Sequence, residues 1–262
     1  MNKKILISII TVVRNDEKNI EKTIKNIINL KNESKNESIE YVIVDGNSTD
    51  NTKKIINNYR NFIDKFISEP DINLYDAINK GIRLSSGQVI GCCSSGDIYK
   101  PGALNIVANY FIKNPNVDFF FGTIIRNYVD ATRIKHGFYP DKIWYQFDVL
   151  TSHSTGFFIT RDAQNKVGEY DLKFPISSDY DFFYRLMAKH KLKGISSTKS
   201  EIIGEMSSGG VSSTVTYLDH LKEVAKIRFK NKQNIFLIIL IIINSIFKNI
   251  PRIVRDFKCS FN

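Results

Sequence analysis

The stretch Val89-Ile-Gly-Cys-Cys-Ser-Ser-Gly-Asp97 joins an apolar strand to small polar residues and ends at a carboxylate. Residues 5–13 and 41–45 show the same pattern, since each apolar run breaks into polar, turn-forming residues. Strands of this buried type indicate an open α/β sheet, which binds ligands at the carboxyl edge of its strands. An acid at that edge can hold a divalent metal against a phosphate, so the pattern favours nucleotide-linked chemistry.

Predicted strands and helices alternate through the first half of the chain. After the first strand, Asn15 or Asp16 can cap a helix whose isoleucines at 20, 24, 27 and 28 share one buried face. The alternation predicts a mostly parallel open sheet flanked by helices. Strands are expected at residues 5–13, 41–45, 62–68, 88–93, 117–125 and 156–160, and further helices at residues 74–84, 179–190 and after Pro101.

Composition bounds the domain organisation. The chain has 262 residues, of which 42% are hydrophobic and 24% charged, as in a soluble globular protein with one core. Three cysteines, two of them adjacent, fit a reducing compartment. The apolar run after Lys3 and Lys4 superficially resembles a secretion signal, but it is short and lacks a small-residue cleavage site, so we expect a strand there. We expect one catalytic domain at residues 1–215, with a nucleotide half at about 1–115 and an acceptor half at about 116–215.

A basic and apolar helical tail is expected at residues 216–262. Residues 221–262 hold nine basic and two acidic side chains, so +7 of the net charge of +10 lies there and +3 elsewhere. The middle of this tail, residues 235–243, is apolar at every position, but it is too short to span a bilayer. The pattern favours a monotopic or re-entrant membrane anchor over a helix packed on the domain or on a partner. We therefore expect a cytoplasmic protein at the inner face of the cell membrane.

Two acids follow predicted strands. Asp97 can be a metal ligand at the sheet edge, or a turn acid ahead of Pro101. Asp45 can accept hydrogen bonds from a base or ribose, or it can close an Asx turn beside Gly46. We favour the functional role for both, and a helix-capping role for Asp50.

A third group of charged residues follows the third strand. Asp76 and Lys80 are four residues apart on a predicted helix, which is the spacing of a surface ion pair. Lys80 can instead face a diphosphate, and spacing alone leaves both roles open.

A further pair of acids begins a predicted helix. Asp179 and Asp181 both suit a helix N-terminus through its dipole, and one of them can serve as a general base. His153 lies between a loop and a strand, where ligand contacts are common, although a lone histidine is more often structural.

Six motifs in this order resemble the family 2 glycosyltransferases, and most closely the bacterial branch that builds exopolysaccharide, capsule and O-antigen repeat units. The resemblance covers about residues 5–212, and the ordered set is far more specific than any single motif. The motifs are Ser8-Ile-Ile-Thr-Val-Val-Arg-Asn15, Val44-Asp-Gly-Asn-Ser-Thr-Asp50, Glu69-Pro-Asp71 with Tyr75-Asp-Ala-Ile-Asn-Lys-Gly81, Ser95-Gly-Asp97, His153 and Ser178-Asp-Tyr-Asp181.

The resemblance implies a GT-A (nucleotide-diphospho-sugar transferase) fold and direct inversion at the anomeric carbon. It implies that Asp97 holds Mn²⁺ or Mg²⁺ against the departing diphosphate and that Asp179 deprotonates the acceptor hydroxyl. Expected partners are a nucleotide-diphosphate sugar donor and a saccharide or lipid-linked saccharide acceptor at the membrane surface. The expected nucleotide-sugar-binding residues are Thr11, Val13, Arg14, Asp45, Asp71, Asp76, Lys80, Ser95 and His153.

Two departures from the family pattern bear on the function. Gly46 and Gly96 each stand where many relatives carry the second acid of a pair. The first weakens any inference of a uracil base, and the second leaves Asp97 as the sole acid at its strand end. Since some polysaccharide-building relatives share the Ser-Gly-Asp form, we expect activity to be retained.

Three other functions account for parts of the sequence less well than sugar transfer does. One is a sugar-nucleotide-binding relative with weak or no activity, because the acid pairs are incomplete. Another is a nucleic-acid-binding protein, which only the sequence pI of about 9.3 suggests and which the location of the charge disfavours. A nicotinamide dehydrogenase is disfavoured because no Gly-x-Gly-x-x-Gly follows the first strand.

Overall fold

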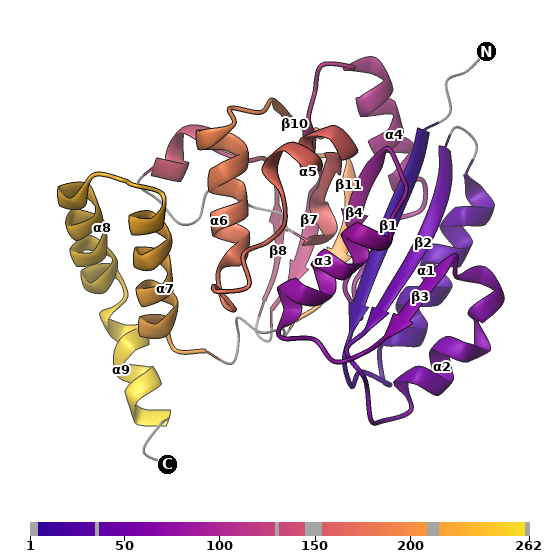
Figure 1. Ribbon diagram of the computed structural model, residues 1–262, viewed down its shortest axis with the longest axis horizontal. Helices are drawn as coiled ribbons and strands as arrows, with labels where there is room; N and C mark the ends of the chain where they lie inside the picture. Colours follow the sequence, from indigo (N-terminus) through magenta and orange to yellow (C-terminus); the bar gives the residue numbers. More distant parts are fainter. Residues whose placement is uncertain (1–4, 35–36, 129–130, 145–153, 209–214, 260–262) are drawn as a thin grey trace.

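A seven-stranded mixed sheet forms the centre of the protein (Figure 1). The computed structural model describes residues 5–34, 37–128, 131–144, 154–208 and 215–259. The strands of this sheet are β1 (Ile5–Val13), β2 (Glu37–Asp45), β3 (Lys65–Ser68), β4 (Val89–Cys92), β6 (Phe119–Phe121), β9 (Phe157–Thr160) and β10 (Gly194–Ser196). Their order is β10-β6-β9-β4-β1-β2-β3.

The first 115 residues supply a run of parallel strands in this sheet. Strand β1 pairs in parallel with β2 and β4, and β2 pairs in parallel with β3. Strand β9 runs antiparallel to β4 and β6, so strands after residue 115 extend the same sheet. The predicted α/β class and flanked open sheet are confirmed.

A smaller sheet lies beside the main one in the order β5-β11-β7-β8. Its strands are β5 (Ile98–Tyr99), β7 (Thr123–Asn127), β8 (Thr132–Lys135) and β11 (Ile202–Met206). Strand β5 directly follows Asp97, and β11 directly precedes Ser207, so this sheet brings those two residues together.

Helices cover both faces of the main sheet because successive side chains of β1 point to opposite sides. Ile7 and Ile9 pack in the core formed with α1 and α4, whereas Ile10 and Val12 pack in the core formed with α3, α5, α6 and α7. The helices are α1 (Ile20–Glu33), α2 (Thr52–Asn58), α3 (Leu74–Leu84), α4 (Ala103–Lys113), α5 (Arg161–Val167), α6 (Ser178–Tyr184), α7 (Tyr217–Lys230), α8 (Ile235–Lys248) and α9 (Ile250–Cys259). Short 3₁₀ turns occur at Arg60–Phe62, Pro140–Trp144 and Ser154–Gly156.

Four predicted elements differ from those observed. The strand expected at residues 41–45 already begins at Glu37. The expected strand at residues 117–125 is two strands in two sheets, β6 and β7, separated at Gly122, where Ile203 leaves no room for a side chain. The expected strand at residues 62–68 begins only at Lys65, after a 3₁₀ turn. The expected helix at residues 179–190 is α6 followed by a π-helical segment, Arg185–Lys189.

The expected tail divides into two parts. Helix α7 packs on the sheet-containing domain, since Val224 and Ile227 belong to the same core as α6. Helices α8 and α9 form the end of the described chain, and Pro251 lies in the first turn of α9. Within the described ranges, no single helix is long and apolar enough to cross a bilayer, whereas α8 and α9 meet that criterion only as a pair bent by 71°. The predicted loop at Gly209 to Ser212 lies outside the described residues.

Candidate active site

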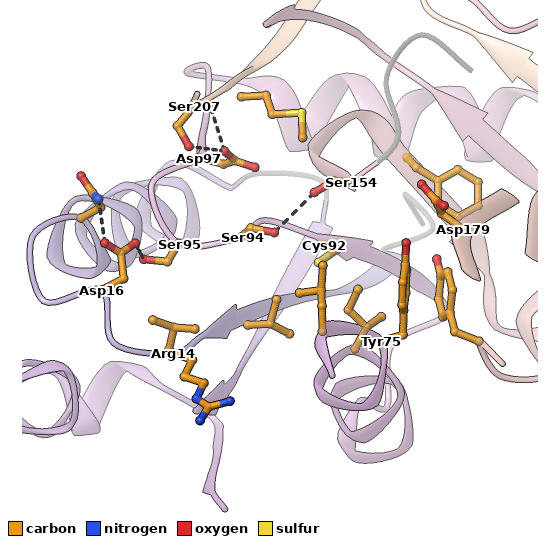
Figure 2. Close-up of a pocket in the computed structure, with 18 of the residues that line it drawn as sticks. Arg14, Asp16, Tyr75, Cys92, Ser94, Ser95, Asp97, Ser154, Asp179 and Ser207 are labelled. Atoms are coloured by element: carbon orange, nitrogen blue, oxygen red, sulfur yellow. Dashed lines mark hydrogen bonds between the residues drawn. The ribbon is translucent and has the colours of Figure 1, made fainter. Parts of the chain in front are cut away.

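A cavity of about 520 Å³ opens at the carboxyl ends of β1 and β4, the edge at which the sequence predicts a ligand site (Figure 2). One part of its wall is polar and charged, with Arg14, Asp16, Ser94, Ser95, Asp97 and Arg126. Another part is apolar and aromatic, with Leu74, Tyr75, Ile78, Phe157, Tyr170 and Phe183. Asp179 lies at this second part, beside Tyr75 in Figure 2. The cavity therefore combines a polar region suited to phosphates with an apolar region suited to a ring.

Asp97 follows a tight turn at the end of β4. Gly96 has a φ of +91°, which L side chains rarely adopt and glycine adopts freely. The turn directs the Asp97 carboxylate toward Ser207, whose backbone N–H and hydroxyl donate to Oδ1 at 2.9 and 3.1 Å. Thr155 donates to Oδ2 at 2.6 Å. These donors join the end of β4 to the 3₁₀ turn before β9 and to the end of β11.

The charge state of Asp97 reflects its burial. Only 3% of the residue is exposed, and burial raises its pKa above the ordinary value. Hydrogen bonds from Thr155 and Ser207 and the positive charge of Arg126 act in the opposite direction. A carboxylate has about four lone-pair sites, and hydrogen bonds from the described residues occupy three of those of Asp97.

Several oxygen atoms that could ligate a hard metal ion lie at this end of the cavity. Near Asp97, the Ser95 hydroxyl donates to the Asp16 carboxylate at 2.6 Å, and the Ser94 and Ser154 hydroxyls lie 3.5 Å apart. Oxygen ligands of this kind suit Mg²⁺ or Mn²⁺. The described residues hold no group of three or more His, Cys, Asp or Glu side chains that could ligate a metal by themselves. A metal at Asp97 would therefore need oxygen atoms from a bound phosphate or water.

Asp179 and Asp181 have different environments, although both lie in the first turn of α6. Asp179 lines the cavity and accepts a hydrogen bond from the Tyr180 backbone at 2.8 Å. Asp181 is fully buried and pairs with Arg185 at 2.8 Å and with Lys230 at 2.9 Å. Of these two acids, only Asp179 is placed to meet a bound ligand.

Tyr75 links Asp179 to the apolar wall. Its hydroxyl donates to the Ile176 carbonyl at 3.1 Å, and its ring stacks on Tyr170 with centroids 5.5 Å apart. Burial raises the pKa of Tyr75 well above its ordinary value, and the negative charge of Asp179 adds to that rise. Tyr75 therefore stays protonated beside the acid.

Glu223 of α7 holds the N-terminus of α6. Ser177, the residue before α6, makes no side-chain cap. Instead the Glu223 carboxylate accepts hydrogen bonds from the backbone N–H groups of Ile176 and Ser177. Burial raises the pKa of Glu223, and the nearby charge of Asp179 contributes further. A side chain from the expected tail therefore positions the turn that carries Asp179.

Thr11 and Asp45, two of the expected binding residues, are fully buried and do not line the cavity. The Thr11 hydroxyl donates to the Cys93 carbonyl at 2.8 Å and accepts from Tyr41 at 3.2 Å. The Asp45 carboxylate accepts from the Ser48 backbone and hydroxyl and from the Ser68 hydroxyl. In the structure Asp45 therefore has the geometry of a turn acid, the alternative to a contact with a base or ribose.

Lys80 forms an ion-pair cluster outside the cavity lining. Its ammonium lies 2.8 Å from Asp71, 3.0 Å from Glu69 and 3.4 Å from Asp76. Burial by itself would lower the pKa of Lys80, but the hydrogen bonds to Asp71 and Glu69 raise it overall. The sequence left open whether Lys80 forms an ion pair or faces a diphosphate. In the structure Lys80 forms ion pairs and does not line the cavity.

The departure at Gly46 has a local explanation. A Cβ built at this position would lie 2.7 Å from Oδ2 of Asp71 and 3.3 Å from the Arg14 side chain. The Asp71 carboxylate thus occupies the space that a side chain at position 46 would need.

Among the remaining expected residues, Val13, Arg14 and Ser95 line the cavity. His153 lies outside the described residues, and its neighbour Ser154 lines the cavity. Sequence reasoning missed Arg126, Ser207 and Tyr170, which reach the site from distant segments. It assigned Asp16 only a capping role, although the placement of this acid directly after β1 was an available signal.

Comparison with protein-family models matches residues 8–192 to "Glycosyl transferase family 2". A PGL/p-HBAD biosynthesis glycosyltransferase of Mycobacterium bovis is 26% identical over 192 residues, which cover 71% of this chain and 72% of that protein. The hyaluronan synthase of Pasteurella multocida is 25% identical over 59% of this chain and 16% of its own length.

Solved structures share the fold at low sequence identity. Residues 1–349 of S. aureus TarS, in complex with UDP-GlcNAc, superpose with a TM-score of 0.64 at 15% identity, covering 85% of this chain and 65% of that one. The mannosyltransferase PcManGT of Pyrobaculum calidifontis, in complex with GDP-Man and Mn²⁺, gives 0.60 at 14% identity, covering 87% and 64%. With a family match over most of its length and the fold of these enzymes, the chain belongs to glycosyl transferase family 2 and is a glycosyltransferase of the GT-A fold.

Proposed function

We propose that this enzyme inverts the anomeric carbon of a nucleotide-diphosphate sugar while transferring the sugar to a saccharide acceptor, with the help of a divalent metal. The observation that carries the proposal is that Asp97 and Asp179 line one cavity from different walls. Asp97 lies among oxygen donors and Asp179 beside aromatic rings (Figure 2). A phosphate-binding end and a base are thereby provided on either side of a bound sugar.

The reaction is a single displacement. The acceptor hydroxyl oxygen forms a bond to the anomeric carbon and its proton passes to the Asp179 carboxylate. The bond from that carbon to the diphosphate oxygen breaks, and the electron pair leaves with the nucleotide. When bound at Asp97, Mn²⁺ or Mg²⁺ would neutralise the charge that develops on the diphosphate. Attack from the face opposite the leaving group inverts the configuration.

Two arginines support the donor end of the cavity. Arg126 lies close enough for its charge to lower the pKa of Asp97, and Arg14 lines the same region. Guanidinium groups bind phosphate through paired hydrogen bonds, so we assign the diphosphate to this end. Tyr75 and Tyr170 give the other end the flat faces on which a sugar ring packs.

The relatives support the reaction class and leave the substrates open. TarS is solved with UDP-GlcNAc and PcManGT with GDP-Man, so the fold accepts different bases and sugars. One sequence relative is a glycosyltransferase of PGL/p-HBAD biosynthesis and another is a hyaluronan synthase. We therefore propose a saccharide acceptor, lipid-linked in the cell, within surface-polysaccharide synthesis.

A binding protein without transfer activity is the second candidate, because Gly46 and Gly96 replace acids and the Asp97 oxygens already accept three hydrogen bonds. The test is a thermal-shift screen of nucleotide sugars with and without Mn²⁺, since a bound ligand raises the apparent stability. Turnover of the binding donor is then compared between wild type and Asp179→Asn. We expect the variant to bind the donor and to turn over 10²–10⁴-fold more slowly. Donor binding without turnover in the wild type would favour the second candidate.

A further inference from the structure

The α8–α9 pair carries an unusual concentration of exposed apolar side chains. Nine of the sixteen large hydrophobic residues that are exposed in the described part of the chain lie within residues 235–254. Phe236 is 74% exposed, Phe247 69% and Leu240 64%, whereas Ile238 is the one buried residue of α8. A helix packed on its own domain buries its apolar face, so α8 needs a different partner.

The exposed residues form one stripe. Phe236, Leu240, Ile243 and Phe247 follow the i, i+4, i+7, i+11 spacing of a single helix face. Ile250 and Val254 continue the apolar surface on α9. The opposite side is tied to α7 by polar contacts, because Tyr217 bonds to the Ser245 carbonyl, the Asn249 amide and the Asp256 carboxylate. We call the six exposed residues Phe236, Leu240, Ile243, Phe247, Ile250 and Val254 the apolar stripe.

Positive charge surrounds the apolar stripe. The acids of α7 and α9 all have partners, since Glu223 accepts from backbone amides, Asp256 accepts from the Tyr217 backbone and Asp219 pairs with Lys222. Exposed basic side chains on α7, α8, α9 and the connection after α7 are Lys222, Lys226, Lys232, Lys248, Arg252 and Arg255. An apolar stripe edged by cations complements an anionic lipid surface.

Helix α8 alone is too short to cross a bilayer. Its 14 residues make a helix about 21 Å long, whereas the hydrocarbon core is about 30 Å thick. The 71° bend before α9 turns the chain away from a straight continuation. A second copy of this chain would bury the stripe, but it would bring two basic rims together, and Asp219 is the one exposed acid among the described residues of α7, α8 and α9. The geometry and charge favour a bilayer.

From these observations we propose that α8 and α9 lie in the plane of an anionic membrane, with the apolar stripe in the acyl region and the basic rim at the headgroups. Helix α7 connects this surface to the active site, since Glu223 bonds to the turn before α6 and Lys230 pairs with Asp181. In Figure 1, α9 extends toward the same side to which β1–β3 point, the side of the cavity. Membrane docking thus holds Asp179 near a lipid-linked acceptor. This last step rests on the proposed function, whereas the docking does not.

The test is flotation of the full chain with vesicles of phosphatidylcholine, with and without phosphatidylglycerol. We expect the wild type to bind the vesicles containing phosphatidylglycerol and to dissociate as salt rises. Phe236→Glu/Leu240→Glu/Phe247→Glu should weaken binding at least tenfold. Lys248→Glu/Arg252→Glu/Arg255→Glu should remove the preference for phosphatidylglycerol. Phe62→Glu/Ile134→Glu, which alters exposed apolar residues elsewhere, is the matched control and should bind as the wild type does.

Two results would overturn the proposal. In the first, the wild type binds both vesicle types equally and the stripe variant binds them as the wild type does. In the second, the wild type is a dimer that binds no vesicles and the stripe variant is a monomer, which would mean that a second copy covers the stripe. Thermal shift by the donor is measured on every variant and should stay as in the wild type. Loss of vesicle binding with intact donor binding separates this proposal from the proposed function.

Discussion

Single residues in this protein show how burial and function oppose each other. Asp97 is 3% exposed, and burial raises its pKa even though Thr155 and Ser207 donate hydrogen bonds to it. A raised pKa means that the folded protein binds the Asp97 proton more tightly than the unfolded chain does. The contribution of Asp97 to folding stability is therefore greatest at low pH. It is lost as the pH rises from the pKa of Asp97 in the unfolded chain to its higher pKa in the folded protein.

Asp97→Asn removes this pH-dependent loss. In metal-free protein at neutral pH we expect the variant to have a higher melting temperature than the wild type, because burial penalises only the charged carboxylate. The gain should shrink as the pH is lowered, because the wild-type carboxyl becomes protonated. Melting curves at several pH values measure the effect. A constant difference at all pH values would show that the charge of Asp97 is not its cause.

Local sequence patterns account for the elements better than for their contacts. The strand ends, α1 and α3 follow from periodicity and turn residues, and so does the placement of Asp97 at the sheet edge. The burial of Asp45 and the ion pairs of Lys80 depend on side chains that meet only after folding, such as Ser68 and Glu69. The break at Gly122 depends in the same way on Ile203, 81 residues later.

The contact between α6 and α7 gives a prediction at the scale of elements. Glu223→Ala leaves the Ile176 and Ser177 amides without their carboxylate, which should cost about 1–3 kcal/mol of unfolding free energy. The first turn of α6 should loosen, so turnover should fall while donor affinity stays within a few-fold of the wild type. Urea unfolding, donor titration and turnover give the three values.

Asp219→Ala is the control on the same helix. Asp219 is exposed and pairs with Lys222, so its loss should change the unfolding free energy by about 0.5 kcal/mol and leave turnover unchanged. If both variants lowered turnover equally, the effect would belong to α7 as a whole and not to the Glu223 contact.

At the scale of the whole molecule, the catalytic core extends beyond residue 215. The composition of residues 216–262 suggests one tail, yet α7 adds Leu221, Val224 and Ile227 to the buried core and only α8 and α9 remain at the surface. Amino-acid composition averages over a segment and cannot separate a helix with one buried face from a neighbouring helix with an exposed one. The buried positions of α7 do follow helical spacing, which is the signal that marks it as part of the core.

Two truncations test this division. A chain ending at residue 234 should keep the melting temperature and donor binding of the full protein, because it retains α7. A chain ending at residue 215 should lose about 5 kcal/mol or more, since three buried apolar side chains and the Glu223 contact are removed. Equal stability of the two truncated chains would contradict the assignment of α7 to the core.

If Asp97 holds a divalent metal against the diphosphate of the donor, as we propose, donor binding depends on that metal and on this carboxylate. Calorimetric titration of the best-binding nucleotide sugar into wild type and Asp97→Asn, each with and without Mn²⁺, measures both dependences. Mn²⁺ should tighten binding to the wild type at least tenfold and leave binding to the variant unchanged. An equal effect of Mn²⁺ on both proteins would mean that Asp97 does not hold the metal.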